Sequence, residues 1–338
     1  MDKTRNVLIE GIGHYLPQRK VTNAELSAET GIDSDWIAQS SGVHTRHRAD
    51  RKNGESTPYL AAQAAREAFE EAGCTVEDVD LIISASGTHY ESIPDTATFI
   101  QAELGAGRSG IPCFGMHTSC LSFLTAMDAA ASFLATARYR RILIVTAEIA
   151  SAGLNYADRE TGPLFGDGAA AAVVRLRQTD DPVSPFAAIH AMRFETYGDD
   201  AKLSGVPGGG TRLPLADSDV KRSDGVFRMN GGGLLKRATK TLPRFLQKLY
   251  PELGTEAEKD TVYVLHQASA AGFRLVERLG LAPERTVRTL TEYGNCIGAS
   301  LPLTLHKAIR TGKLRRGQKC LMIGTAAGVT YGGALLTY

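Results

Sequence analysis

The sequence predicts an α/β protein. Apolar runs of strand length alternate along the chain with segments whose apolar residues recur at helical spacing. The strand-like runs are unbroken rather than alternating, which is typical of buried, largely parallel sheets. The order of these segments also recurs in the second half of the chain. We therefore expect two similar α/β units.

The first half supplies the elements in a regular succession. A helix is expected to stop at Gly73, because glycine is the usual residue just past a helix end. The expected strands are Val7–Ile9, Leu81–Ile83, Arg141–Val145 and Ala170–Val174, and the expected helices are Thr57–Ala72 and Leu121–Ala135.

The second half repeats this hydrophobic order at an offset of about 160 to 180 residues. The repeated positions are Asp260–Leu265, the neighbourhood of Asn295–Cys296, Leu321–Ile323 and Ala334–Leu336. A fixed offset indicates two copies of one supersecondary unit. We place the halves at residues 1–176 and 177–338. A Gly-, Asp-, Ser- and Pro-rich segment at about 196–228 is expected to be a long loop. Functional loops should meet at the seam between the halves.

Composition excludes several classes of protein. The chain has 338 residues, of which 43% are hydrophobic and 22% charged, and its net charge is +1. This balance argues against a general nucleic-acid binder, which would show a basic domain or stripe. The five cysteines are odd in number, widely spread and free of C-x-x-C pairs. This pattern argues against a disulfide framework or a zinc site, and we expect no metal.

The N-terminus leads directly into an apolar strand and shows no hydrophobic core of a signal peptide. No window approaches the roughly 18 apolar residues that a membrane span needs. We therefore expect a cytoplasmic protein with free thiols and without a membrane span.

Cys120 is the first candidate for chemistry. It follows a strand-like run and precedes the apolar helix, with Ser119 as a plausible N-cap. Cys120 would then occupy the first helical position, where the helix dipole lowers the pKa of a thiol. The resulting thiolate could take an acyl group from a thioester. The alternative is a small buried core thiol.

Two further polar residues lie where strands or turns end. His266 follows an apolar strand, and the ends of strands are where α/β sites collect. A hydrogen-bonded structural histidine is the alternative. Asn295 follows Gly294, which by itself indicates a turn. Its amide could instead stabilise developing negative charge.

Two small-residue loops complete the pattern. They read FGDGAA at 165–170 and GTAAGVTYGGA at 324–334. Neither has the spacing of a nucleotide-binding loop, so phosphate cradling is disfavoured. Small residues there would let backbone N–H groups approach a ligand closely.

The joint order of these signals is specific. The chain shows Cys120, then GDGAAAAV, then His-Gln-Ala, then Gly-Asn-x-x-x-Ala-Ser-x-Pro, then a Gly-rich C-terminus. In this order it resembles β-ketoacyl-acyl carrier protein synthase III of the thiolase superfamily. The segments 11–17, 35–47 and 158–169 also match that family, so the resemblance covers essentially the whole chain. It implies a thiolase fold, with duplicated halves in layers αβαβα.

The resemblance implies roles for the central residues. Cys120 would be the acylated nucleophile, while His266 and Asn295 would bind the malonyl thioester carbonyl and promote decarboxylation. Two hydrogen-bond donors aimed at the enolate oxygen stabilise its charge as it develops. Backbone N–H groups of Cys120 and Ala327 would form the oxyanion hole. A homodimer, and no metal or redox cofactor, are implied as well.

The resemblance also implies binding residues. Trp36 and Arg159 would contact the adenine and phosphates of coenzyme A, which arrives as a thioester substrate. Ser269 would lie beside them. Lys236 and Arg237 would receive an acidic acyl carrier protein, although a solvated helix face is an alternative. The extender would be malonyl-acyl carrier protein or malonyl-coenzyme A.

Several positions depart from the family pattern. A second arginine near the tryptophan is Ser40, an asparagine after His-Gln-Ala is Ser269, and a following arginine is Ala271. A pantetheine-contacting asparagine is replaced within Gly231–Gly233. These changes point to a specialised paralogue that uses a longer or functionalised acyl primer, in fatty-acid or specialised-metabolite biosynthesis.

Three other functions remain open. The first is acyl transfer to an oxygen or nitrogen acceptor, for which Asn295 would be dispensable. The second is a silent subunit of a heterodimer, against which the intact Cys, His and Asn set argues. The third is a non-decarboxylating thiolase, which generally has a second cysteine near the C-terminal Gly loop. Here Cys320 lies on the preceding strand instead.

Overall fold

Two five-stranded sheets form the framework of the molecule. The computed structural model describes residues 4–338. One sheet has the order β1-β7-β6-β4-β5 and the other has the order β12-β11-β13-β14-β8. The first consists of β1 (Val7–Tyr15), β7 (Gly168–Leu176), β6 (Arg141–Glu148), β4 (Leu81–Ser84) and β5 (Cys113–Gly115). The second consists of β12 (Thr286–Val287), β11 (Val262–Leu265), β13 (Lys319–Ala326), β14 (Thr330–Thr337) and β8 (Ala188–Thr196).

The two sheets share one topology. In the first, β4 runs parallel to β5 and β6, whereas β7 runs antiparallel to β6 and β1. In the second, β11 runs parallel to β12 and β13, whereas β14 runs antiparallel to β13 and β8. This duplication and the α/β class confirm the predicted fold. The boundary at residue 176 stays a prediction.

The expectation of largely parallel sheets is wrong, because each sheet is mixed. An unbroken apolar run indicates that a strand is covered on both faces. It does not indicate whether the strand runs parallel or antiparallel to its neighbours. The run at 170–174 belongs to β7, which is buried from Gly168 to Val174 and yet antiparallel to both of its neighbours.

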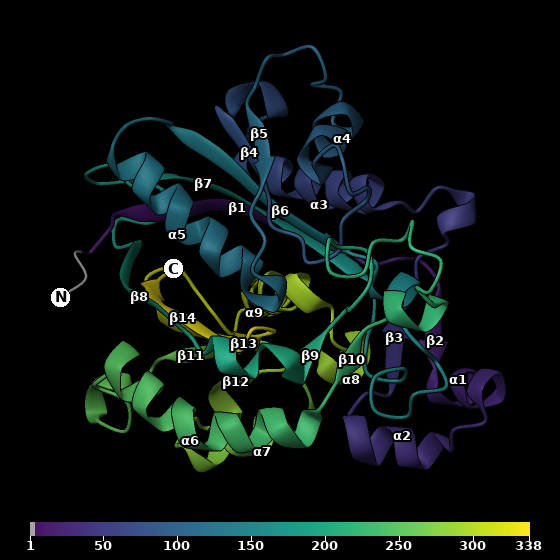
Figure 1. Ribbon diagram of the computed structural model, residues 1–338. Coiled ribbons are helices and arrows are strands. Elements are labelled where there is room, and N and C mark those ends of the chain that lie inside the picture. Colours follow the sequence, from purple (N-terminus) through teal and green to yellow (C-terminus); the bar gives the residue numbers. More distant parts are fainter. Residues whose placement is uncertain (1–3) are drawn as a thin grey trace.

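Helices cover the sheets in layers (Figure 1). Helices α5 (Ser122–Ala135) and α9 (Ser300–Arg310) lie between the sheets, and their side chains join both sheets in one buried cluster. Helices α3 (Thr57–Ala72) and α4 (Thr96–Glu103) cover the outer face of the first sheet. Helices α6 (Gly231–Leu249) and α7 (Ala270–Arg278) cover the second. The predicted layering is therefore present.

The sequence explains the position of the helices. In α5, the buried Ala, Leu, Phe and Met residues occupy most of the helix surface, whereas Ser132 and Ala135 are exposed. Helix α3 lies unusually close to β1. A Cβ atom at Gly11 or Gly13 would lie 2.2 Å from the carbonyl oxygen of Ala68 or Ala64, so only glycine permits this approach.

The smaller elements surround the entrance to the site. Strands β2 and β3 pair with each other, as do β9 and β10, which close the base of the long segment predicted at 196–228. That segment is otherwise irregular. No helix within residues 4–338 is both long and apolar enough to cross a bilayer. The remaining elements are β2 (Lys20–Thr22), α1 (Asn23–Thr30), α2 (Ser34–Ser41), β3 (Thr45–His47), β9 (Ser204–Gly205), β10 (Arg228–Met229) and α8 (Leu290–Tyr293).

Candidate active site

A cavity of about 940 Å³ receives residues from both halves of the chain. Most of its lining is apolar and comes from α6, α7 and the loops beside them. Seven of the nine residues singled out from the sequence line it: Cys120, His266, Asn295, Ala327, Trp36, Arg159 and Ser269. Large cavities with few convergent polar groups are typical of ligand sites. The seam between the halves is therefore the candidate active site.

Cys120 lies at the junction of β5 and α5, but its local geometry differs from the prediction. Helix α5 begins at Ser122, and Cys120 sits in a preceding 3-10 turn of residues Ser119–Leu121. Ser119 is not an N-cap, because it is inside that turn and has a φ of 48°. The hydroxyl of Ser122 accepts from the Thr118 N–H at 2.9 Å instead.

The predicted lowering of the Cys120 pKa is wrong as well. Burial, with a smaller contribution from the nearby Glu148 carboxylate, raises the pKa of this thiol to about 12. Desolvation disfavours the thiolate and outweighs the helix dipole in the unliganded site. Cys120 therefore has to lose its proton during the reaction rather than before it.

His266 follows β11 directly, as predicted. Its backbone N–H donates to the carbonyl of Ile323 on β13 at 2.9 Å. Burial lowers the pKa of the imidazole to about 4, so the ring is neutral at pH 7. Its Nδ1 atom is buried and has no hydrogen-bond partner within residues 4–338. Because the ring is neutral and lines the cavity, it can exchange a proton with a ligand.

Asn295 lies in a loop that also contacts the first half of the chain. Its backbone N–H donates to Leu164 and its carbonyl accepts from Gly166. Its side-chain oxygen accepts from the Ile297 N–H at 2.9 Å, which fixes the orientation of the amide. The amide nitrogen makes only a long 3.4 Å contact with the Ala268 carbonyl. Its N–H groups are thus available to a ligand oxygen.

Glu148, the last residue of β6, was not singled out from the sequence. Its buried carboxylate accepts from the N–H groups of Gly87, Thr88 and Gly298 and from the Thr88 hydroxyl, at 2.6–3.2 Å. Burial raises its pKa to about 7. Glu148 thus connects the Asn295 loop with the loop after β4. A glutamate at the end of a largely apolar, buried strand was the signal that could have identified it.

Ala327 lies in the turn between β13 and β14 and lines the cavity. The turn has small residues on both sides, as the sequence indicated. The backbone of this turn is therefore accessible from the cavity, which is what an oxyanion role would require.

Trp36 and Arg159 contact each other at the cavity wall. The guanidinium carbon of Arg159 lies 5.1 Å from the centroid of the Trp36 ring, within the range of a cation–π contact. Trp36 is 36% exposed. Ser40, which replaces an expected arginine, lines the same cavity. The pair offers an aromatic face and a positive charge to an incoming ligand.

Ser269 serves as a helix cap. It is the N-cap of α7, and its hydroxyl accepts from the Gly272 N–H at 3.2 Å. The start of α6 is organised similarly, because the Asn230 side chain accepts from the Gly233 N–H at 2.8 Å. Both polar side chains beside the cavity thus have local partners. Ala271 and Gly231–Gly233 add no polar side chain.

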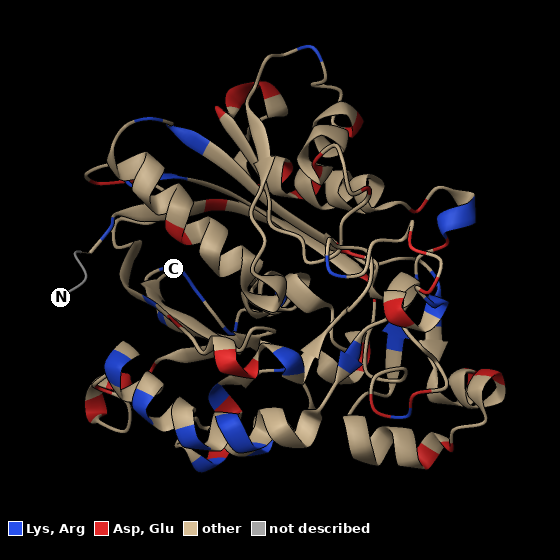
Figure 2. Cartoon of the chain, viewed as in Figure 1, with Lys and Arg blue, Asp and Glu red and all other residues tan. Residues whose placement is uncertain are grey.

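Lys236 and Arg237 lie on α6 and do not line the cavity. Lys236 is exposed, whereas Arg237 is half-buried, paired with Asp200 and stacked over Tyr197. Figure 2 shows that basic residues gather on α6 and α7. These include Lys236, Lys240, Arg244, Lys248, Arg274 and Arg278. Lys236 belongs to a broader basic surface, and Arg237 faces the protein.

Comparisons with known proteins agree with this geometry. Residues 252–338 match the model of the 3-oxoacyl-[acyl-carrier-protein (ACP)] synthase III C-terminal region, and residues 114–192 match that of 3-oxoacyl-[acyl-carrier-protein (ACP)] synthase III. The chain is 35% identical to a β-ketoacyl-[acyl-carrier-protein] synthase III of Neisseria gonorrhoeae, covering 98% of each chain. The chain belongs to the β-ketoacyl-[acyl-carrier-protein] synthase III family.

Solved structures of this synthase family have the same fold. The structure of 3-oxoacyl-[acyl-carrier-protein] synthase III from Aquifex aeolicus matches with a TM-score of 0.85 and 33% identity, covering 99% of this chain and 100% of that one. The priming β-ketosynthase of the R1128 polyketide pathway matches with a TM-score of 0.85 and 26% identity, covering 100% and 98%. Family membership and the thiolase fold predicted from the motifs are confirmed.

Proposed function

We propose that this synthase catalyses a decarboxylative Claisen condensation, in which an acyl group on Cys120 joins a malonyl thioester to give a β-ketoacyl thioester. The observation that carries the proposal is the convergence of three groups on one cavity. These are the Cys120 thiol, the neutral His266 ring and the Asn295 amide with its available N–H groups.

The first step loads the enzyme. The Cys120 sulfur attacks the carbonyl carbon of an acyl-coenzyme A, the Cys120 thiol loses its proton, and the coenzyme A thiolate leaves and takes up a proton. Because the thiol has a high pKa, its proton has to be removed as the sulfur attacks. The neutral His266 ring can accept that proton. The Cys120 and Ala327 N–H groups would stabilise the tetrahedral oxyanion.

The second step forms the carbon–carbon bond. Breaking the bond between the malonyl carboxylate and its methylene carbon releases CO2 and leaves an enolate. Donors on His266 and Asn295 stabilise the enolate oxygen. The enolate carbon attacks the acyl carbon on Cys120, and the Cys120 thiolate leaves and recovers a proton. The bonds and charges balance without a metal or a redox cofactor.

The substrates follow from the surroundings of the cavity. Trp36 and Arg159 are suited to the adenine and phosphates of coenzyme A. The basic residues of α6 and α7 are suited to an acidic carrier protein that delivers the malonyl group, with malonyl-coenzyme A as the alternative. We infer that the enzyme works as a cytoplasmic homodimer.

A specialised primer is part of the proposal. Along the cavity wall, Ser40, Ala271, Gly231 and Gly232 provide fewer polar contacts than the family pattern implies. The apolar side chains of α6 and α7 leave a cavity of about 940 Å³. A primer longer than acetyl, or one with an added functional group, would use this space.

The test is the intact mass of the protein after incubation with a panel of acyl-coenzyme A thioesters. We expect an acyl adduct from one chain-length class and none in Cys120→Ala. An adduct of equal yield in Cys120→Ala would remove the nucleophile from the proposal. No adduct from any thioester would favour a primer delivered by a carrier protein or a silent subunit.

Asn295→Ala distinguishes condensation from acyl transfer to an oxygen or nitrogen acceptor. Loss of its donors should lower the rate of condensation by about 100- to 1,000-fold, the usual cost of an oxyanion donor. Acylation of Cys120 should be largely retained. If product formation from the acyl-enzyme also continues unchanged, transfer rather than condensation is the activity.

A further inference from the structure

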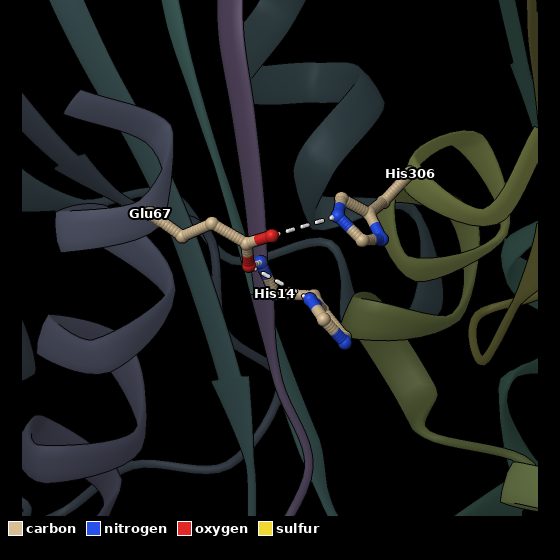
Figure 3. Close-up of side chains that lie close together, drawn as sticks. All are labelled: His14, Glu67 and His306. Carbon is tan, nitrogen blue, oxygen red and sulfur yellow. Dashed lines mark hydrogen bonds and ion pairs between the residues drawn. The ribbon is translucent and has the colours of Figure 1, made fainter. Parts of the chain in front are cut away.

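A second cluster of metal-ligating side chains lies outside the cavity. His14 from the end of β1, Glu67 from α3 and His306 from α9 converge with their side chains pointing toward one another (Figure 3). One ligand atom from each residue lies within 4.8 Å of the others. None of the three lines the cavity. The proposed condensation therefore does not account for this cluster.

The protein holds the cluster in place from three elements. Glu67 accepts from the His14 backbone N–H at 2.7 Å and bonds to Nδ1 of the same residue at 2.8 Å. Nε2 of His306 lies 3.2 Å from the other carboxylate oxygen. The close approach of α3 to β1 at Gly13 fixes the separation of the first two residues. These side chains are thus oriented before any ligand arrives.

We propose that His14, Glu67 and His306 form a binding site for a divalent transition-metal ion, with Zn²⁺ as the best fit. Two imidazoles and one carboxylate form a ligand set that Zn²⁺ accepts, and water can take the fourth position. In a tetrahedral zinc site the ligand atoms lie about 3.3 Å apart. Nε2 of His306 lies 3.2 Å from one Glu67 oxygen and Nδ1 of His14 lies 2.8 Å from the other, so a small outward shift would make room for the ion.

Binding requires a small rearrangement. The two imidazole rings are stacked with their centroids 4.1 Å apart and their planes at 22°, so one ring has to rotate to direct its nitrogen at the ion. The His14 side chain is 35% exposed and has room to do this. Arg310 lies 3.7 Å from Glu67 but is 58% exposed, so the guanidinium can move into solvent.

The hydrogen bonds to Glu67 use the same nitrogens that would bind the ion. Metal binding needs a lone pair on each ligand nitrogen. Nδ1 of His14 and Nε2 of His306 therefore exchange their hydrogen bonds to Glu67 for bonds to the ion.

The ion would connect three layers of the fold. Helix α3 covers the outer face of the first sheet, β1 belongs to that sheet, and α9 lies between the sheets. A ligand that binds the folded state alone stabilises it by mass action. The site is therefore structural, and condensation at Cys120 does not depend on it.

Zn²⁺ binding by equilibrium dialysis tests the proposal, with a Cys120→Ala background in every protein so that this thiol cannot contribute. We expect one equivalent of Zn²⁺ per chain. His14→Ala and Glu67→Gln should each weaken binding by more than about tenfold. His190→Ala is the matched control, because His190 lies on β8 and bonds Thr337 instead. It should bind like the parent.

Two further readouts guard against variants that do not fold. Co²⁺ should give the intense visible absorption of a tetrahedral site in the parent, and this absorption should be absent in His14→Ala. His14 is chosen because it is the most exposed of the three residues, so its replacement disturbs the fold least. Zn²⁺ should raise the melting temperature of the parent and leave that of His14→Ala unchanged. Absence of Zn²⁺ binding to the parent, or full affinity in both ligand variants, would overturn the proposal.

Discussion

At the scale of single residues, burial decides the chemistry of the cavity. Cys120 and Glu148 both have raised pKa values and His266 has a lowered one, with desolvation as the largest cause in each case. Burial favours the neutral form of each group, and the pKa of about 7 leaves Glu148 partly ionised at pH 7. Neutral Cys120 and His266 suit a reaction whose charge develops at the oxyanion and the enolate.

Glu148 and His266 should give opposite dependences of stability on pH. Glu148 has a pKa of about 7 when folded and 4.5 ordinarily. Between these values the folded state holds a proton that the unfolded state lacks, so its contribution to the free energy of unfolding falls as pH rises. His266 has a pKa of about 4 when folded and 6.5 ordinarily, so its contribution rises with pH in that range.

Between pH 4.5 and 6.5, Glu148 and His266 change the free energy of unfolding in opposite directions in the wild type. Glu148→Gln should make the change of unfolding free energy with rising pH more positive, and His266→Gln should make it more negative. Each shift should approach about 1.4 kcal/mol per pH unit. Urea unfolding at both ends of this range measures it. Identical slopes in the three proteins would show that neither pKa is displaced by folding.

At the scale of elements, the contact between β11 and β13 positions His266. A Cβ atom at Gly324 would lie 2.7 Å from the Cβ of His266 and 3.1 Å from Leu121. Only glycine lets β13 pass this close to both His266 and Leu121 of the 3-10 turn before α5. The small-residue loop predicted at 324–334 thus includes Gly324, where packing requires a glycine, as well as positions that face the cavity.

Gly324→Ala should therefore displace His266. We expect a loss of about 1–3 kcal/mol in unfolding free energy from overpacking and a fall in condensation rate of at least about tenfold. Gly198→Ala is the control, because a Cβ atom there meets nothing within 4 Å. Urea unfolding and initial rates measure both effects. Wild-type activity in Gly324→Ala would show that the ring position is not critical.

The two basic residues of α6 should have separate roles. Lys236→Ala should raise the KM for a malonyl carrier protein about two- to fivefold and leave the KM for malonyl-coenzyme A unchanged, because an exposed lysine contributes modest attraction. The difference should shrink in high salt. Arg237→Ala should slightly lower the free energy of unfolding, because Arg237 pairs with Asp200. Equal KM changes for both substrates would contradict carrier docking at Lys236.

At the scale of the whole molecule, one edge of the first sheet suggests how two copies would assemble. Strand β5 is the last strand in the order of its sheet and presents unpaired backbone groups at that edge. Beside it, the loop ending at Asp95 carries Ile93, which is 86% exposed. Pairing of two copies along β5 would cover this edge.

We therefore expect sedimentation at twice the chain mass of 36.2 kDa. Ile93→Lys should weaken the dimer, because a charge would enter an apolar interface. Analytical ultracentrifugation over a range of protein concentrations measures the dissociation. The control is Leu215→Lys, because Leu215 is also a strongly exposed apolar residue, with 75% of its surface accessible. This variant should leave the dimer intact. A monomer at all concentrations would refute the homodimer.

The sequence by itself was sufficient for the fold class, the duplication and the candidate residues, because these depend on local patterns. Strand and helix periods reveal which faces are buried, and the order of motifs identifies the family. Seven of the candidate residues are far apart in the chain and line one cavity, and their roles stay predictions.

Tertiary structure decided what depends on three-dimensional surroundings. The pKa of Cys120 depends on burial and on Glu148, the role of Ser269 depends on the start of α7, and the direction of β7 depends on its neighbours. The contact between His14, Glu67 and His306 also depends on tertiary structure. Glu67 is 53 positions from His14 and 239 positions from His306 in the chain. Local patterns fix which residues are buried, whereas packing between distant segments fixes what each buried group contacts.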